Sequence, residues 1–192
     1  MKNLNVFTLT GQFNSMKESG LTIVYTGNGK GKTTAALGIV LRAAGHQKKI
    51  CMIQFIKGSW HYGEMTSSKK LEPEFEMVAV GKGFVGIIDD TKPREDHKKI
   101  AEEAIKICKT KIQSEKYDII ILDEVNYAVN LGLVNLEDVV DLIKTKPPNL
   151  DLVLTGNYVK KEVIELADLV TEMKEIKHPF KLGKKAKKGI DF

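Results

Sequence analysis

The stretch Thr26-Gly27-Asn28-Gly29-Lys30-Gly31-Lys32-Thr33-Thr34 decides the fold of this chain, because it joins an apolar run of strand length to an alanine- and leucine-rich helical pattern. It is nearly a phosphate-binding loop. The usual pattern has a glycine five positions before the final Gly-Lys-Thr, and Thr26 occupies that position here, so the loop is one residue short. A glycine-rich turn that opens a helix gathers backbone N–H groups and the positive end of the helix dipole at one point. We therefore predict that the stretch binds a polyphosphate.

The residue types inside the loop suit a nucleotide. Its glycines can adopt positive φ and let phosphate oxygens approach the backbone. Lys32 supplies a positive charge, and the hydroxyl of Thr33 can ligate Mg²⁺. The simpler alternative is a tight turn between a strand and a helix. A dinucleotide-binding fingerprint is excluded, because its third glycine would fall on Lys32 and the next strand ends in Gln54-Phe55 without an acid. The predicted triphosphate site comprises Gly27, Asn28, Gly29, Lys30, Gly31, Lys32, Thr33 and Thr34.

A second chemical feature is the apolar run Ile119-Ile120-Ile121-Leu122, which ends abruptly in Asp123 and Glu124. A buried strand with this ending delivers carboxylates to the carboxyl edge of a sheet, beside the phosphate loop. There one acid can hold Mg²⁺ directly or through water. The alternative is that Asp123 only caps a helix from Val125 to Leu131. We predict the metal role, because the acids accompany a phosphate loop.

Strand-like and helical patterns alternate along the chain. Such alternation predicts an α/β fold with a mostly parallel sheet covered by helices on both faces. With the phosphate loop, we expect the P-loop, RecA-like type. Ligands then bind at the carboxyl ends of the strands. Helices are predicted over Lys32–Ala44, over Pro93–Ser114, and after a cap at Asn135 until Pro147-Pro148. The predicted strands are Leu21–Thr26, Ile50–Phe55, Phe75–Val80, Asp118–Leu122, Asp151–Thr155 and Leu169–Met173.

Length and composition favour one compact domain. The chain has 192 residues, of which 42% are apolar and 29% charged, as is usual for soluble globular proteins. We expect a single domain over residues 21–192, preceded by a polar segment over residues 1–20. No run of eighteen apolar residues occurs, so we expect no membrane partner and a cytoplasmic location. Cys51 and Cys108 lie in apolar patterns and are predicted to be core thiols.

The positive charge is concentrated near the C-terminus. Residues 174–188 hold seven lysines and one glutamate, a local charge of +6, whereas the whole chain carries +5. This basic segment, 174–192, has few aromatic residues and no arginine, so we expect no nucleic-acid partner. It is either a solvated tail or a segment that folds over an anionic ligand.

The ordered series of motifs resembles the ATP-dependent corrinoid adenosyltransferases, and the resemblance covers about residues 21–192. The motifs are the short phosphate loop, Phe55-Ile56-Lys57-Gly58-Ser59-Trp60, Gly63-Glu64, Gly83-Phe84, Leu122-Asp123-Glu124, Leu154-Thr155-Gly156, Ala167-Asp168, Lys177-His178, Phe180, Gly183, Ala186 and Gly189-Ile190-Asp191-Phe192.

The resemblance implies an unusual use of ATP. The family is thought to bind ATP in the reverse of the usual orientation, so that the Co(I) centre of a reduced corrinoid attacks the ribose C5′ carbon and the whole triphosphate leaves. The loop would then stabilise the leaving group, through backbone N–H groups, Lys32, and Mg²⁺ (or Mn²⁺) held by Thr33 and Glu124, with Asp123 acting through water. The implied substrates are ATP and cob(I)alamin, cobinamide or cobyrinic acid diamide. A homodimer and an electron-donor protein are also implied.

Aromatic residues in this family are thought to shield the lower face of the corrinoid. Phe84 matches that role, although it could also anchor a loop in the core. The family pattern has a tryptophan two positions later, where this chain has Gly86, and an arginine where this chain has Asn157. Trp60 is either a substitute for the missing aromatic or a packing residue.

Histidines 46, 61, 97 and 178 do not have metal-site spacing, and His178 is either a ligand contact or a surface residue. The competing functions are a P-loop kinase or ATPase, which cuts ATP at phosphorus, and an ATP-binding regulatory switch that uses the basic segment as an interaction arm. The loop length argues against a kinase or ATPase. The regulator stays open as an alternative, and it would leave the Gly83-Phe84 loop with no role beyond packing.

Overall fold

The computed structural model describes residues 19–56, 62–80 and 94–192. Six parallel strands form one sheet in the order β3-β2-β4-β5-β1-β6. The strands are β1 (Thr22–Thr26), β2 (Ile50–Gln54), β3 (Phe75–Ala79), β4 (Ile119–Asp123), β5 (Asp151–Thr155) and β6 (Leu169–Glu172). The predicted α/β class is confirmed, and each predicted strand is present with ends that differ by at most one residue.

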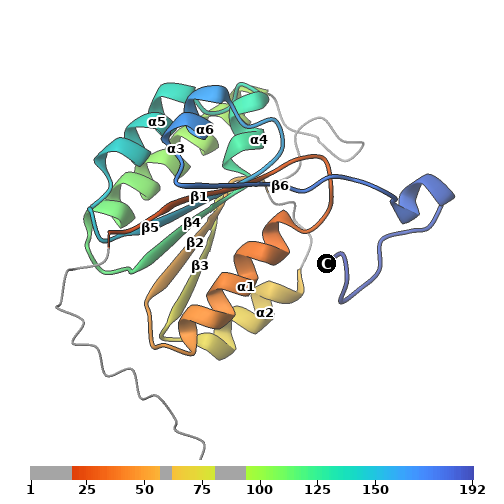
Figure 1. Ribbon diagram of the computed structural model, residues 1–192, viewed down its shortest axis with the longest axis horizontal. Helices are drawn as coiled ribbons and strands as arrows, with labels where there is room; N and C mark the ends of the chain where they lie inside the picture. Colours follow the sequence, from red (N-terminus) through yellow and green to blue (C-terminus); the bar gives the residue numbers. More distant parts are fainter. Residues whose placement is uncertain (1–18, 57–61, 81–93) are drawn as a thin grey trace, which may run out of the picture.

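Helices cover both faces of the sheet, as predicted (Figure 1). One face carries α1 (Lys32–Ala44) and α2 (Gly63–Ser68), and the other carries α3 (Arg94–Gln113), α4 (Val125–Asn130), α5 (Leu136–Thr145) and α6 (Lys161–Leu166). Among the described residues, no helix has the length and apolar character needed to cross a membrane.

Each face has its own core, because side chains alternate between the two sides of a strand. In β4, Ile120 and Leu122 face the larger helical layer, whereas Ile119 and Ile121 pack with α1. The central strands β2 and β4 are buried along their whole length. This double burial explains why their sequences read as continuous apolar runs. Cys51 and Cys108 are both buried free thiols in the larger core, as predicted.

The helix ends agree with the predicted ones at most positions. Helix α1 has the predicted bounds, and α3 ends at Gln113, one residue before the predicted end. Asn135 occupies the N-cap position of α5 as predicted, but its side chain makes no capping hydrogen bond and its amide contacts Asp138 instead. The N-cap of α4 is Glu124, so the alternative in which Asp123 caps that helix is wrong.

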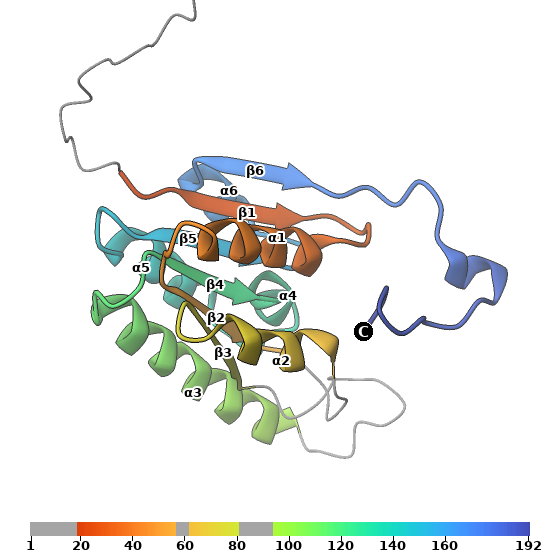
Figure 2. The same cartoon turned by 90° about the horizontal axis from the view of Figure 1, so that it is seen from below.

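The strand order brings the two predicted chemical features together. Strand β5 alone separates β1, which leads into the phosphate loop, from β4, which ends in the acids. In a parallel sheet all of these strands end at the same edge, and Figure 2 shows the C-terminal segment returning to that edge.

Candidate active site

The phosphate loop wraps around the start of α1. Gly27 and Gly31 have φ values of 96° and 113°, which a residue with a side chain rarely adopts. Gly29 has no positive φ, contrary to expectation, but a Cβ there would lie 2.7 Å from the carbonyl oxygen of Met173. Its N–H donates to that same oxygen at 2.6 Å. Gly29 is therefore needed for a close approach to the segment that follows β6.

Lys32 lies inside the loop that precedes it. Its Nζ donates to the carbonyl oxygens of Gly27 and Gly29, each at 2.9 Å. Burial lowers the pKa of the Lys32 ammonium below the usual lysine value, and the nearby charges of Glu124 and Asp123 offset part of that effect. Lys32 is thus a half-buried cation beside two acids.

Asp123 is the centre of a buried polar network at the end of β4. Its side chain is fully buried, and Oδ1 accepts hydrogen bonds from the hydroxyls of Thr33 at 2.9 Å and Thr155 at 2.8 Å. Oδ2 accepts from Nε2 of Gln54 at 3.2 Å. The carboxylate therefore joins the start of α1 to strands β2 and β5, and three donors compensate its burial.

The donors at this edge fit a hard divalent cation. The hydroxyl proton of Thr33 is used toward Asp123, which leaves the oxygen lone pairs free for a metal. Glu124, on the same side, lines the cavity beside the loop. Within residues 19–56, 62–80 and 94–192, no group of three or more His, Cys, Asp or Glu side chains could hold a metal alone. A cation here would share its ligands with phosphate, as Mg²⁺ usually does.

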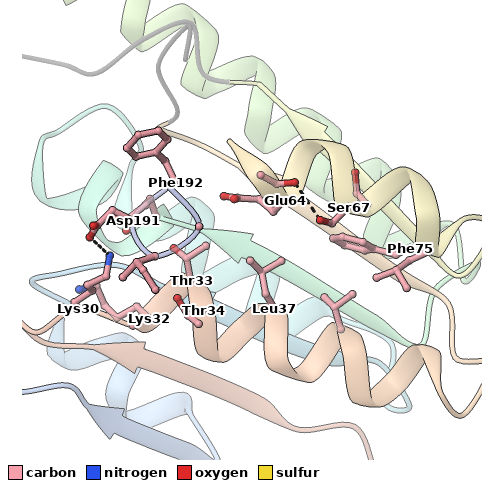
Figure 3. A pocket seen from close by; sticks show the side chains of 18 residues that line it. Lys30, Lys32, Thr33, Thr34, Leu37, Glu64, Ser67, Phe75, Asp191 and Phe192 are labelled. Carbon is pink, nitrogen blue, oxygen red and sulfur yellow. Dashed lines mark hydrogen bonds and ion pairs between the residues drawn. The ribbon is translucent and has the colours of Figure 1, made fainter. Parts of the chain in front are cut away.

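A cavity of about 610 Å³ opens beside the loop, between α1 and α2 (Figure 3). Its polar end contains Lys30 to Thr34 and Glu124, and its other end is apolar around Leu37 and Phe75. The cavity is large enough for a nucleotide-sized ligand. Of the predicted triphosphate residues, Lys30, Gly31, Lys32, Thr33 and Thr34 line it, whereas Gly27 and Asn28 line a separate pocket with Asn157 and Tyr158.

The C-terminal segment forms one wall of this cavity. Residues 189–192 line it, and Asp191 makes an ion pair of 2.5 Å with Lys30 of the loop (Figure 3). The backbone N–H of Lys187 also donates to Asp191, at 2.6 Å. At its other end, the segment is held where Asn28 Oδ1 accepts from the N–H of Glu175 at 3.0 Å. The basic segment thus begins and ends in contact with the phosphate loop.

Phe84, Gly86 and Trp60 lie outside the described residues, as does His61. His178 accepts a hydrogen bond from the N–H of Phe180 and so caps a short 3₁₀ turn, Pro179–Leu182.

Three contributors to the site received no site role from the sequence, although two of them lie in motifs of the resemblance, namely Gln54, Thr155 and Asp191. Gln54 and Thr155 are the polar residues that end the apolar runs of β2 and β5, just as Asp123 ends β4. A polar residue at the carboxyl end of a buried parallel strand was therefore the available signal. The pairing of Asp191 with Lys30 had no such signal, because 161 positions separate them.

Comparison with known proteins agrees with this geometry. The family model described as ATP:corrinoid adenosyltransferase BtuR/CobO/CobP matches residues 18–192. The chain is 39% identical to the corrinoid adenosyltransferase of Escherichia coli K12, over 91% of this chain and 87% of that protein. It is 35% identical to the corrinoid adenosyltransferase CobA of Salmonella typhimurium LT2, over 93% and 88% of the two chains. A short phosphate loop that contacts a buried acid and lines a cavity is thus found in a chain that belongs to the ATP:corrinoid adenosyltransferase family.

Proposed function

We propose that this protein transfers the 5′-deoxyadenosyl group of ATP to the Co(I) centre of a reduced corrinoid, forming adenosylcobalamin or a precursor of it. The observation that carries the proposal is the phosphate loop, one residue short, which opens onto a nucleotide-sized cavity beside the buried Asp123 and the cavity-lining Glu124, in a member of this family. The corrinoid is the nucleophile, so the protein needs no nucleophilic side chain of its own.

The reaction is a displacement at carbon. Co(I) donates an electron pair to C5′ of the ribose, the C5′–O bond breaks, and the triphosphate leaves with the electrons of that bond. Negative charge on the triphosphate therefore increases as the bond breaks. Groups that contact the triphosphate stabilise the transition state more than the ground state, which is the requirement for a faster chemical step.

Lys32 is the main positive side chain for this purpose. Its ammonium donates to two loop carbonyls in the structure, and a triphosphate offers it stronger, charge-assisted hydrogen bonds. Burial disfavours the charged form of Lys32 because less water surrounds the ammonium. For the same reason, its electrostatic attraction to a nearby phosphate is stronger than that of an exposed lysine. The backbone N–H groups at the start of α1 act in the same direction.

Thr33 and Glu124 would hold Mg²⁺ (or Mn²⁺), with Asp123 acting through water. Bound there with ATP, the metal supplies positive charge to the triphosphate. The chain prepares for this by using the Thr33 proton toward Asp123, so that the hydroxyl oxygen faces the cation with its lone pairs. We assign a supporting role to Asn28 and Gly29, which hold the loop against the segment after β6, and to Gly27, whose carbonyl accepts from Lys32.

The corrinoid would bind where Co(I) reaches C5′ of the ATP, and Phe84 is the residue proposed to shield its lower face. Cob(I)alamin, cobinamide and cobyrinic acid diamide are the candidate substrates. Dimerisation and electron delivery by a partner protein are further proposals, and light scattering coupled to size-exclusion chromatography tests the first.

The decisive experiment is anaerobic incubation of the protein with MgATP and chemically reduced cob(I)alamin. The absorbance spectrum follows the cobalt–carbon product, and chromatography identifies the released phosphates. We expect adenosylcobalamin and intact triphosphate in equal amounts. Lys32→Ala should slow the reaction roughly 100-fold, as removal of one donor to developing charge does in other enzymes. Lys106→Ala, a change at an exposed lysine of α3, serves as the matched control.

Other products would support other functions. ADP and inorganic phosphate without a corrinoid product would make the protein an ATPase or kinase that cuts ATP at phosphorus. ATP binding without any reaction, tested with all three corrinoids, would leave a regulatory switch. Either result would overturn the proposed transfer.

A further inference from the structure

Glu124 has an unusual backbone conformation. Its φ of 64° and ψ of 18° lie in the left-handed region, which costs a residue with a Cβ about 1 kcal/mol. Such a conformation persists only when the surrounding structure enforces it, and it is found where a side chain must be aimed. Here it turns the chain from β4 into α4 within one residue and leaves Glu124 at the wall of the cavity.

Thr155 is the residue that enforces this turn. Its Oγ1 accepts a hydrogen bond from the backbone N–H of Glu124 at 2.9 Å. The same oxygen donates its proton to Oδ1 of Asp123 at 2.8 Å. One hydroxyl therefore contacts both acids, the side chain of the first and the backbone of the second. Only serine or threonine offers a donor and an acceptor on a single atom at this short reach.

The environment of Thr155 makes these contacts strong. Thr155 and Asp123 are both fully buried, so water does not compete for the hydroxyl. The residue after Thr155, Gly156, has a φ of 125°, and a Cβ there would lie 2.7 Å from the backbone nitrogen of Tyr127. The end of β5 is therefore packed directly against the first turn of α4. Loss of the hydroxyl would leave Glu124 N–H and one lone pair of Asp123 without this partner.

We propose that Thr155 is a positioning residue that sets the relative placement of the two acids for the metal of the ATP complex. Gln54 assists by holding Oδ2 of Asp123, so that Oδ1 keeps its direction toward Thr33. Thr155 touches neither metal nor nucleotide in this role. It acts through Asp123 and Glu124, and it rests on the proposed function because that function requires both acids at one cation.

The role predicts a specific effect on metal binding. Thr155→Val keeps the shape and burial of the side chain but removes the hydroxyl. Mn²⁺ affinity, measured by electron paramagnetic resonance in the presence of ATP and without corrinoid, should fall about tenfold or more, as it does when an outer partner of a metal ligand is removed. Thr155→Ser, which keeps the hydroxyl, should restore affinity to within about threefold of the wild type.

The matched control is Thr22→Val. Thr22 is a threonine of β1 that is only 2% exposed, at the amino end of the strand and away from the acids. The Thr22→Val variant should have unchanged Mn²⁺ affinity. Its melting temperature measures how much stability is lost when a buried threonine of a strand is replaced by valine. If Thr155→Val does not fold, Thr155→Ser and Thr155→Ala are compared, because both lack the methyl group and differ only in the hydroxyl.

Equal Mn²⁺ affinity in the hydroxyl-containing and hydroxyl-free variants would overturn the proposal. So would an equal loss in Thr22→Val, since the effect would then be general. Neither result bears on adenosyl transfer, which is judged by the cobalt–carbon product of the wild type. Conversely, an inactive wild type that nevertheless shows the Thr155 effect would overturn the transfer reaction and leave the metal geometry standing.

Discussion

At the scale of single residues, the site depends on a few side chains that are held by hydrogen bonds within the protein. Lys32 donates to two loop carbonyls and Thr33 to a carboxylate, so contacts within the protein hold both side chains. Preorganisation of this kind reduces the cost of ordering side chains when a ligand binds. The electrostatics of Lys32 then determine how ATP affinity depends on pH.

We predict that ATP affinity begins to weaken with rising pH at a lower pH than it would if Lys32 had the pKa of an ordinary, exposed lysine. Burial lowers the pKa of Lys32 in the free protein, and a bound triphosphate raises it again. Lys32 therefore contributes fully to ATP affinity at pH values below its pKa in the free protein. This contribution is lost as the pH rises through the pKa that Lys32 has in the ATP complex. Isothermal titration from pH 7 to 10.5 should show a loss of roughly tenfold, the worth of one charge-assisted hydrogen bond.

Lys32→Met provides the control for that titration, because it removes the titrating group. Its ATP affinity should be weak and nearly constant over the same pH range. A wild-type affinity that stays constant up to pH 10.5 would contradict the prediction.

The sequence showed some of these residues and not others. Lys32, Thr33 and Glu124 belong to short motifs whose spacing carries their chemistry, so they could be predicted as site residues. Thr155 and Asp191 act across 32 and 161 positions, and only the folded chain brings them to their partners.

At the scale of elements, the junction between β5 and α4 is a tight contact beside the acids. Gly156→Ala should lower the free energy of unfolding by about 2 to 3 kcal/mol, because φ is 125° and the added methyl would meet the backbone of Tyr127. For a chain of this size the melting temperature should fall by roughly 5 to 10 °C. Thermal unfolding followed by circular dichroism measures the change.

Gly38→Ala is the matched control for this substitution. Gly38 lies within α1, and a Cβ there would meet nothing within 4 Å. Because alanine favours a helix over glycine, this variant should be slightly more stable than the wild type. Equal destabilisation by the two changes would show that the junction is not the tight contact that the geometry indicates.

Buried parallel strands were predictable as elements because both of their faces demand apolar side chains. Strand β6 was also predicted, although all four of its residues are exposed, because Leu169 and Val170 keep a strand-like pattern. The short helices α2 and α6 had no individual prediction, since six residues give less than two turns of periodicity. The order in which strands pair depends on contacts far apart in the chain, which no local pattern contains.

At the scale of the whole molecule, the C-terminal segment converts an open sheet edge into a walled cavity. It contributes few buried side chains, so its removal should cost little stability. We predict that deletion of residues 189–192 leaves the melting temperature within about 2 °C of the wild type. The dissociation rate of a fluorescent ATP analogue, measured by stopped flow, should rise by more than the roughly threefold that loss of an exposed ion pair alone would give.

Asp191→Asn distinguishes the ion pair with Lys30 from the cavity wall that residues 189–192 form. It removes the charge opposite Lys30 and retains the wall. If the wall retains the nucleotide, this variant should release the analogue more slowly than the deletion does. A deletion that unfolds many degrees earlier would show that the segment is instead part of the stable core.

The order of the strands also has a consequence for how the chain is made. Strand β1 is the first of the six to leave the ribosome, yet its neighbours in the sheet are β5 and β6, the last two. The apolar segment before the phosphate loop therefore has no partner strand until more than 150 residues have been synthesised. Such delayed, long-range pairing slows folding and leaves apolar surface exposed meanwhile. The nascent chain should thus depend on chaperones most while its first strand waits for its last ones.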